Sequence, residues 1–256
     1  MLPVLQVGPL SIRMPGLVLL AALWLALEVA ARAGVRRGLN PDRLYNFGFL
    51  VVVAGIAGAR LAFVLAHLNL YTRITPVTRA LGAALSLSPG TEIAWAGVLI
   101  AAAAAVLLAR LWRLPPLPLA DAFAPALAVL TLGVGLAALL RGDLLGMPAD
   151  LPWAIDLAGA RRHPTQAYIM LVAAAALIVA WRLERTPPER RAPGTLAQIV
   201  VMVPCVGVLL VEPLRADSAT IGPGLRVMAV AALTVLVADL ALFAARAPVQ
   251  VEEDMA

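Results

Sequence analysis

Residues 120–140 read ADAFAPALAVLTLGVGLAALL and run directly into RGDLLGMPADLPW, residues 141–153. The first stretch carries a single charge, Asp121. It has the length of about 20 apolar residues that a helix needs to cross the hydrocarbon core of a bilayer. The second stretch gathers charged residues, glycines, prolines and a tryptophan, which end a helix and build a connector. An apolar span followed by a polar connector is therefore the pattern to look for elsewhere.

The composition agrees with that pattern. Of the 256 residues, 62% are hydrophobic and 14% are charged, and the mean hydropathy is +0.92. Soluble domains contain about 45–50% apolar residues. The composition excludes a soluble enzyme and predicts a protein embedded in a membrane.

Seven apolar runs are bounded by clusters of arginine, proline or glycine. They lie near residues 9–31, 45–68, 91–112, 120–140, 166–182, 195–213 and 226–246. We therefore predict an all-α integral membrane protein, with seven transmembrane helices in a single domain over residues 1–247. The acidic end, residues 248–256, is predicted to be a tail outside the membrane.

The arginines in short loops indicate the orientation, because cytoplasmic loops accumulate basic residues. Eleven arginines follow the odd-numbered runs, at 32, 36, 37, 43, 110, 113, 182, 185, 190, 191 and 246. Eight lie on the other side, at 13, 73, 79, 141, 161, 162, 215 and 226. We expect the N-terminus outside and the C-terminus with its tail in the cytoplasm. The first run leads straight into Arg32 and Arg36, so we expect it to be retained as a span.

Several other classes of function receive little support. The arginines are scattered through loops instead of forming a basic stripe, so we expect no nucleic-acid partner. The one cysteine, Cys205, lies within an apolar run and is best interpreted as a small buried side chain. Because no metal-ligand spacing such as CxxC occurs, we expect neither a metal nor another cofactor.

Charged residues within the spans are costly and usually have a partner or a function. Arg60, which follows Gly58 and Ala59, either neutralises an acid between helices or binds an anionic headgroup. Asp121 either stabilises the start of its own helix or contributes to a site.

The predicted topology brings a second set of charges to one side. Arg141, Asp143, Arg161, Arg162, His163, Glu212 and Arg215 all fall on the outer side. We expect them to converge on a polar hollow. The charges of Arg161 and Arg162 favour a neutral imidazole at His163, which makes this side chain a candidate base.

Six segments in order resemble one family, the prolipoprotein diacylglyceryl transferases. They are GPLSIR, GARLAFVL, LADAFAP, GDLLGMPADLPW, RRHPTQAY and VEPLRADS. The resemblance spans nearly the whole chain. It implies a seven-helix bacterial inner-membrane enzyme that moves a diacylglyceryl group from phosphatidylglycerol to the lipobox cysteine of a prolipoprotein signal peptide, releasing glycerol phosphate.

The resemblance also assigns site residues. It implies His163 and Asp143 as catalytic residues, with His163 activating the thiol. It implies a second set that binds substrate, namely Arg60, Asp121, Arg141, Arg162, Gln166, Tyr168, Glu212 and Arg215. Within that set Arg60, Arg141 and Arg215 are expected to bind phosphate, because guanidinium groups suit its oxygens.

The chain departs from the family pattern at several polar positions. The FHGG-type signature is AWAG, which puts Trp95 in place of a histidine, and the GRxGN-type signature has Gly135 and Ala138. Val208 stands in place of an arginine and Pro15 in place of a tyrosine. A catalytically degenerate homologue that binds lipid or precursor as a membrane scaffold is therefore the alternative. A small transporter is a weaker one, because corresponding broken helices in the two halves are not evident.

Overall fold

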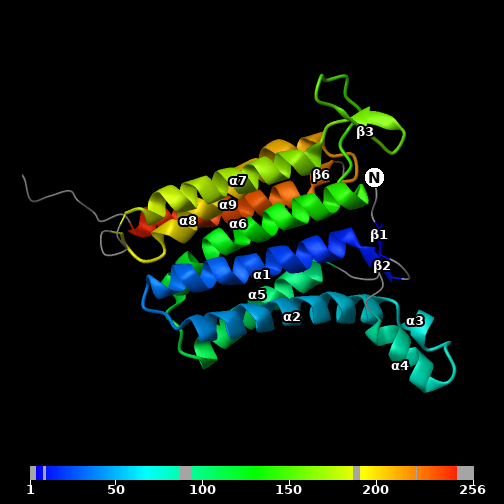
Figure 1. Ribbon diagram of the computed structural model, residues 1–256, viewed down its shortest axis with the longest axis horizontal. Coiled ribbons are helices and arrows are strands. Elements are labelled where there is room, and N and C mark those ends of the chain that lie inside the picture. The colour runs from blue at the N-terminus through cyan, green and yellow to red at the C-terminus, as the bar shows by residue number, and fades with distance from the viewer. Residues whose placement is uncertain (1–3, 8–9, 87–93, 187–190, 223, 247–256) are drawn as a thin grey trace, which may run out of the picture. The chain divides into compact units, whose positions relative to one another are not determined.

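The computed structural model describes residues 4–7, 10–86, 94–186, 191–222 and 224–246 (Figure 1). The chain divides into two compact units. The main unit takes residues 1–38 and 117–256, and the inserted unit takes residues 39–116. A single domain over residues 1–247 stays a prediction, and the expected tail at 248–256 lies outside the described residues.

In the described residues, the main unit is a bundle of helices with three short hairpins. The helices are α1 (Met14–Val35), α6 (Pro116–Arg141), α7 (Thr165–Glu184), α8 (Thr195–Val211) with the 3-10 turn η2 (Glu212–Leu214), and α9 (Val227–Arg246). The antiparallel hairpins pair β1 (Val4–Val7) with β2 (Leu10–Arg13), β3 (Ile155–Leu157) with β4 (Ala160–Arg162), and β5 (Thr220–Ile221) with β6 (Leu225–Arg226). One hairpin lies before α1, one between α6 and α7, and one between η2 and α9. The axes of α6, α7, α8 and α9 lie side by side in Figure 1.

The inserted unit is built on one long helical pair. Helix α2 (Pro41–Ala66) packs along α5 (Ala94–Leu111), and the short helices α3 (Leu68–Tyr71) and α4 (Val77–Leu85) follow α2. Asn40 caps α2 by accepting a hydrogen bond from the Arg43 amide at 3.2 Å, and Pro41 begins the helix.

Each of the seven expected apolar runs contains a helix, and six of these helices are long and apolar enough to cross a membrane. They are α1, α2, α6, α7, α8 and α9. The apolar part of α5, Ala96–Leu111, is shorter. The structure is thus that of a multi-pass helical membrane protein.

The first run begins later than expected. A helix from residue 9 is wrong, because residues 10–13 form strand β2 and α1 starts at Met14. Pro15 occupies the first turn of α1, where its missing amide hydrogen costs nothing. The helix start is therefore set by the proline rather than by the hydrophobicity of the segment before it.

Small side chains fill the interior of the main unit, and large ones face outward. Ala26 and Ala30 of α1 pack on Ala126 and Val129 of α6. At Gly133 of α6 a Cβ atom would lie 2.1 Å from the Cβ of Ala22, so only glycine permits this approach of the two helices. Large side chains such as Trp24, which is 66% exposed, remain on the outside. This distribution suits helices packed within lipid.

Candidate functional site

The connector after α6 organises one end of the main unit. Its backbone pairs on one side with the end of η2, through Met147 N–H to Leu214 O at 2.7 Å and Ala216 N–H to Leu145 O at 2.8 Å. On the other side the His163 amide donates to Met147 O at 3.0 Å. Residues 144–149 therefore hold the His163 loop and the Arg215 loop together. We call this region the connector end.

Two buried side chains fix the start of the connector. Thr165 donates from its hydroxyl to Leu144 O, and Gln166 donates from Nε2 to Asp143 O. Both residues are fully buried at the start of α7. Gln166, predicted to bind substrate, thus contacts the backbone of the connector, while its Oε1 has no hydrogen-bond partner among the described residues.

The last glycine of the GDLLG segment, Gly146, lies directly against the His163 loop. A Cβ at this position would lie 2.1 Å from the carbonyl oxygen of His163. Arg162 reaches the same place, since its Nη1 donates to Gly146 O at 3.0 Å while its Nε donates to Leu157 O at 3.1 Å. The glycine lets the histidine loop pass directly against the connector.

A buried carboxylate is the central charged group of the connector end. Glu212 is 3% exposed, and its Oε2 accepts a hydrogen bond from Arg215 Nη1 at 3.1 Å. Arg215 also donates from Nε and Nη2 to Asp217 Oδ1, at 3.0 and 2.9 Å. The other oxygen of Glu212, Oε1, is buried with no partner among the described residues. A buried acceptor in this condition favours a ligand that brings a hydrogen-bond donor.

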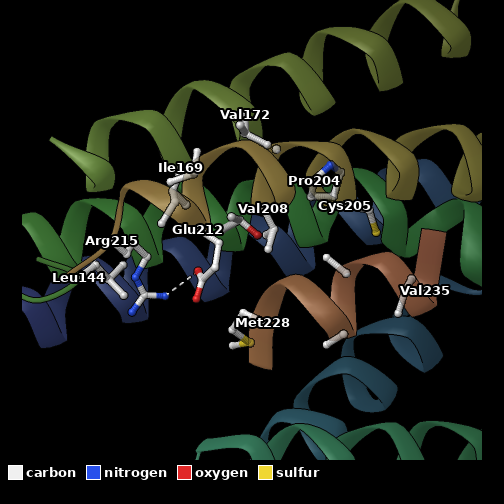
Figure 2. Close-up of a pocket in the computed structure, with 15 residues that line it drawn as sticks. Leu144, Ile169, Val172, Pro204, Cys205, Val208, Glu212, Arg215, Met228 and Val235 are labelled. Atoms are coloured by element: carbon white, nitrogen blue, oxygen red, sulfur yellow. Dashed lines mark hydrogen bonds and ion pairs between the residues drawn. The ribbon is translucent and has the colours of Figure 1, made fainter. Parts of the chain in front are cut away.

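The Glu212–Arg215 pair lies at one end of an apolar cavity of about 410 Å³ (Figure 2). Helices α7, α8 and α9 supply most of its walls, including Ile169, Val208 and Met228. Cys205 lines the cavity farther from the ion pair (Figure 2). An apolar chamber with charged groups at one end fits the shape of an amphiphile with a polar head.

Sequence reasoning missed two members of this cluster. Arg226 had been assigned only to topology, yet its Nη1 donates to the backbone oxygens of Glu212 and Arg215, both at 2.7 Å. Asp217 pairs with Arg215 and also accepts from the Leu145 amide at 3.0 Å. Asp217 falls inside the VEPLRADS segment, so the segment signalled it, whereas nothing in the sequence around Arg226 did.

His163 belongs to a short polar chain at the same end. Trp153 donates from Nε1 to the Tyr168 hydroxyl at 2.9 Å, and this hydroxyl lies 3.3 Å from Nδ1 of His163. The Tyr168 hydroxyl accepts from the indole, and the tautomer of His163 sets whether the same hydroxyl donates to Nδ1 or accepts from it. The ring of His163 is half-buried.

Arg141 and Asp143 form an ion pair on the surface of the connector end. Their side chains are 41% and 53% exposed. The structure thus gathers Arg141, Asp143, Arg162, His163, Gln166, Tyr168, Glu212 and Arg215, all within the main unit and around the connector.

Two expected site residues lie elsewhere. Asp121 is buried at the start of α6, the end of that helix away from Arg141, and its carboxylate accepts from the amides of Gly194 and Ala197, both at 2.8 Å. It thus caps helix α8. Arg60 belongs to the inserted unit, where it donates to the carbonyls of Ala83 and Ala84 at the end of α4. A role in substrate binding stays a prediction for both residues.

The positions at which the chain departs from the family pattern are closed or apolar. A Cβ at Gly135 of α6 would lie 2.6 Å from Met170 Cγ of α7, so the space for a larger side chain there is occupied. Ala138 is buried, Val208 lines the apolar cavity, and Pro15 lies buried at the start of α1. Trp95 lies in α5, and its side chain is outside the described part of the structure.

These features define a class of protein: a multi-pass helical membrane protein with a buried ion pair at the end of an apolar cavity. Comparison with known families gives the particular assignment. The chain belongs to the prolipoprotein diacylglyceryl transferase family, whose model matches residues 3–245.

Relatives of known name agree with this assignment. The phosphatidylglycerol–prolipoprotein diacylglyceryl transferase of Trichormus variabilis is 30% identical over an alignment 259 positions long. The alignment covers 93% of this chain and 87% of the relative. The enzyme of the same name from Synechococcus elongatus is 28% identical, with 85% and 78% covered. That of Corynebacterium glutamicum is 26% identical, with 92% and 79% covered.

Proposed function

We propose that this protein transfers a diacylglyceryl group from phosphatidylglycerol to the cysteine thiol in the lipobox of a prolipoprotein, releasing glycerol phosphate. The observation that carries the proposal is the family match over residues 3–245. The cavity that ends at Glu212 and Arg215 supports it, because a diacylglyceryl chain is apolar and its headgroup is polar.

The reaction needs a nucleophile and a stabilised leaving group. The sulfur of the lipobox cysteine forms a bond to the terminal glyceryl carbon, and the bond between that carbon and the phosphate oxygen breaks. The phosphate oxygen keeps the electron pair. The thiol proton goes to the unprotonated Nε2 of His163, while Nδ1–H donates to the Tyr168 hydroxyl and so orients the ring. Asp143 takes the place of a family carboxylate on the connector and holds Arg141.

Arginine side chains would receive the charge of the phosphate. Arg215 uses three of its five N–H donors on Glu212 and Asp217, which leaves two for a ligand. Arg141 is exposed at the same end and can turn toward an incoming headgroup. Arg162, Gln166 and Tyr168 would bind substrate beside them, and the resemblance adds Asp121 and Arg60.

The membrane arrangement forms part of the proposal. We place the protein in the bacterial inner membrane with seven spans, counting α5, with the N-terminus outside and the C-terminus in the cytoplasm. The connector end then faces outward, where signal peptides of secreted precursors arrive. The arginines that follow α1 and α7 support this orientation.

A specific observation favours a second candidate. The space beside Gly135 is occupied by Met170, and Val208 gives the cavity an apolar wall. The polar side chains of the family pattern are therefore missing from both places. A scaffold that binds lipid or precursor without chemistry would keep the fold and the cavity. It would also tolerate changes in His163.

A transfer assay separates the two candidates. The purified protein is mixed with phosphatidylglycerol and a lipobox peptide, and thioether-linked lipid is detected by mass spectrometry. An enzyme is expected to form product, and His163→Ala is expected to lower the rate by about 10²–10⁴. Arg182→Gln, an exposed change at the other end of α7, serves as the control.

Two results would count against catalysis. One is the absence of product under conditions in which another family member works, and the other is an equal rate for His163→Ala and the control. Retained binding of the peptide or the lipid in either case would support the scaffold.

A further inference from the structure

A second cavity lies in the main unit, at the ends of the helices away from the connector. It measures about 430 Å³ and is lined by Arg36, Arg37, Gly38, Pro118, Asp121, Arg191 and Pro193. Arg36 and Arg37 follow α1, and Arg191 precedes α8. We call this region the arginine end. Of its lining residues, only Asp121 enters the proposed transfer, and it does so through the family resemblance alone.

The charges around this cavity do not balance. Glu184 at the end of α7 pairs with Arg36, and it also accepts from Arg37 Nη1 at 3.2 Å. Asp121 is occupied by the two amides of α8. Among the residues that the structure describes here, three arginines thus face two carboxylates, one of which is engaged by backbone, and one positive charge is in excess.

Arg191 supplies the excess charge and an unused donor. Its Nη2 donates to Thr186 O at 2.9 Å, but its Nε is buried and has no hydrogen-bond partner among the described residues. A buried N–H without an acceptor is unfavourable, and a bound anion would supply the acceptor. Arginine is also the side chain that best matches the oxygens of phosphate.

We infer that the arginine end binds the phosphate group of a ligand, with Arg191 as the main contact and Arg36 beside it. Arg37 is mostly buried against Glu184 and holds the wall of the site. An anionic lipid headgroup is one source of this chemistry, because basic pockets between transmembrane helices bind such headgroups. Free phosphate is the other source.

Lipid binding by the detergent-purified protein tests the inference. Native mass spectrometry would count bound molecules of dioctanoyl phosphatidic acid, and the zwitterionic dioctanoyl phosphatidylcholine would serve as the comparison. Phosphatidic acid is expected to bind wild type, and Arg191→Gln is expected to weaken that binding by about tenfold, the effect of losing one charge-assisted hydrogen bond. Arg191→Lys should lose less, since it keeps the charge without the planar fork.

Arg182→Gln is the matched control, because Arg182 is an exposed arginine in the last turn of α7 that does not line the cavity. Size-exclusion chromatography establishes that each variant is folded. A separate titration with inorganic phosphate, followed by thermal stability, distinguishes the sources: stabilisation of wild type but not of Arg191→Gln assigns the site to a free anion.

Equal binding by Arg191→Gln and Arg182→Gln would overturn the inference, and so would binding of phosphatidylcholine as tight as that of phosphatidic acid. The absence of any response to both phosphatidic acid and inorganic phosphate would overturn it too. Because no arm measures transfer, a failure here leaves the proposed reaction standing, and the reverse also holds.

Discussion

The two ends of the main unit differ in the kind of buried polar atom that has no hydrogen-bond partner among the described residues. At the connector end, a buried carboxylate oxygen of Glu212 has no donor within the described ranges, and backbone pairing of three loops keeps this carboxylate in place. At the arginine end, the buried Nε–H of Arg191 has no acceptor among the residues that the structure describes, and Asp121 caps α8 nearby. The same helices α6, α7 and α8 connect the two ends. The difference supports the two proposals, a ligand with a hydrogen-bond donor at the connector end and an anion at the arginine end.

The largest effect is expected at Glu212. Glu212→Gln keeps the shape and an acceptor for Arg215 but removes the charge. If this carboxylate acts on the substrate, the transfer rate should fall by about 10²–10³, the usual cost of one catalytic electrostatic contact. The rate of thioether formation measures this effect. Asp217→Asn, which alters the exposed side of the same arginine, should reduce the rate less, and equal losses would show that Glu212 is only structural.

The next effect concerns the backbone of the connector. Gly146→Ala places a Cβ against the His163 carbonyl and should lower the free energy of unfolding by about 1–3 kcal/mol. Gly16→Ala in α1 is the control, because no atom lies within 4 Å of the added Cβ. Thermal unfolding in detergent compares the two. If both variants melt at the same temperature, the tight passage at Gly146 is not what fixes the histidine loop.

A third experiment addresses the opposite end. If Asp121 acts as the cap of α8 and does not bind substrate, Asp121→Ala should cost about 0.5–2 kcal/mol of stability while transfer proceeds at the wild-type rate. The melting temperature and the transfer rate are measured on the same preparation. A loss of rate at unchanged stability would instead support the substrate-binding role implied by the family resemblance, and would remove the functional contrast between the two ends.

The smallest effect is expected for the exposed pair of Arg141 and Asp143. A double-mutant cycle with alanine at both positions should give a coupling energy in unfolding of about 0–1 kcal/mol, because solvent screens such pairs. The same cycle in the transfer assay shows whether either charge contacts substrate. A coupling that persists at high salt would contradict the view of a solvent-screened pair.

The sequence predicted the helices well and the small elements poorly. Apolar runs of about 20 residues identify spans because a bilayer imposes that length, whatever the partners of the helix. The bilayer sets no length for the hairpin β3–β4 or for the short helix α4. Both depend on hydrogen bonds between backbone groups that are close in sequence. The start of α1 was placed too early because hydrophobicity alone ignores Pro15.

The candidate site was predicted in part. The segments containing His163 and Glu212 were expected to meet, and the connector does bring them together. Arg226 escaped notice because its contacts are to backbone carbonyls, which leave no sequence pattern. The capping role of Asp121 was also missed, because its partner amides lie in another helix, far along the chain.

By itself, the sequence determined that this chain is a multi-pass helical membrane protein and identified the family to which it belongs. Both follow from the distribution of apolar residues and from short motifs, which are local properties. Only the tertiary structure decided which buried polar atoms have no hydrogen-bond partner within the described part of the chain, Glu212 Oε1 and Arg191 Nε among them. The physical reason is that a hydrogen bond depends on the approach of atoms from different helices and loops, and the identity of one residue does not reveal which partner it meets.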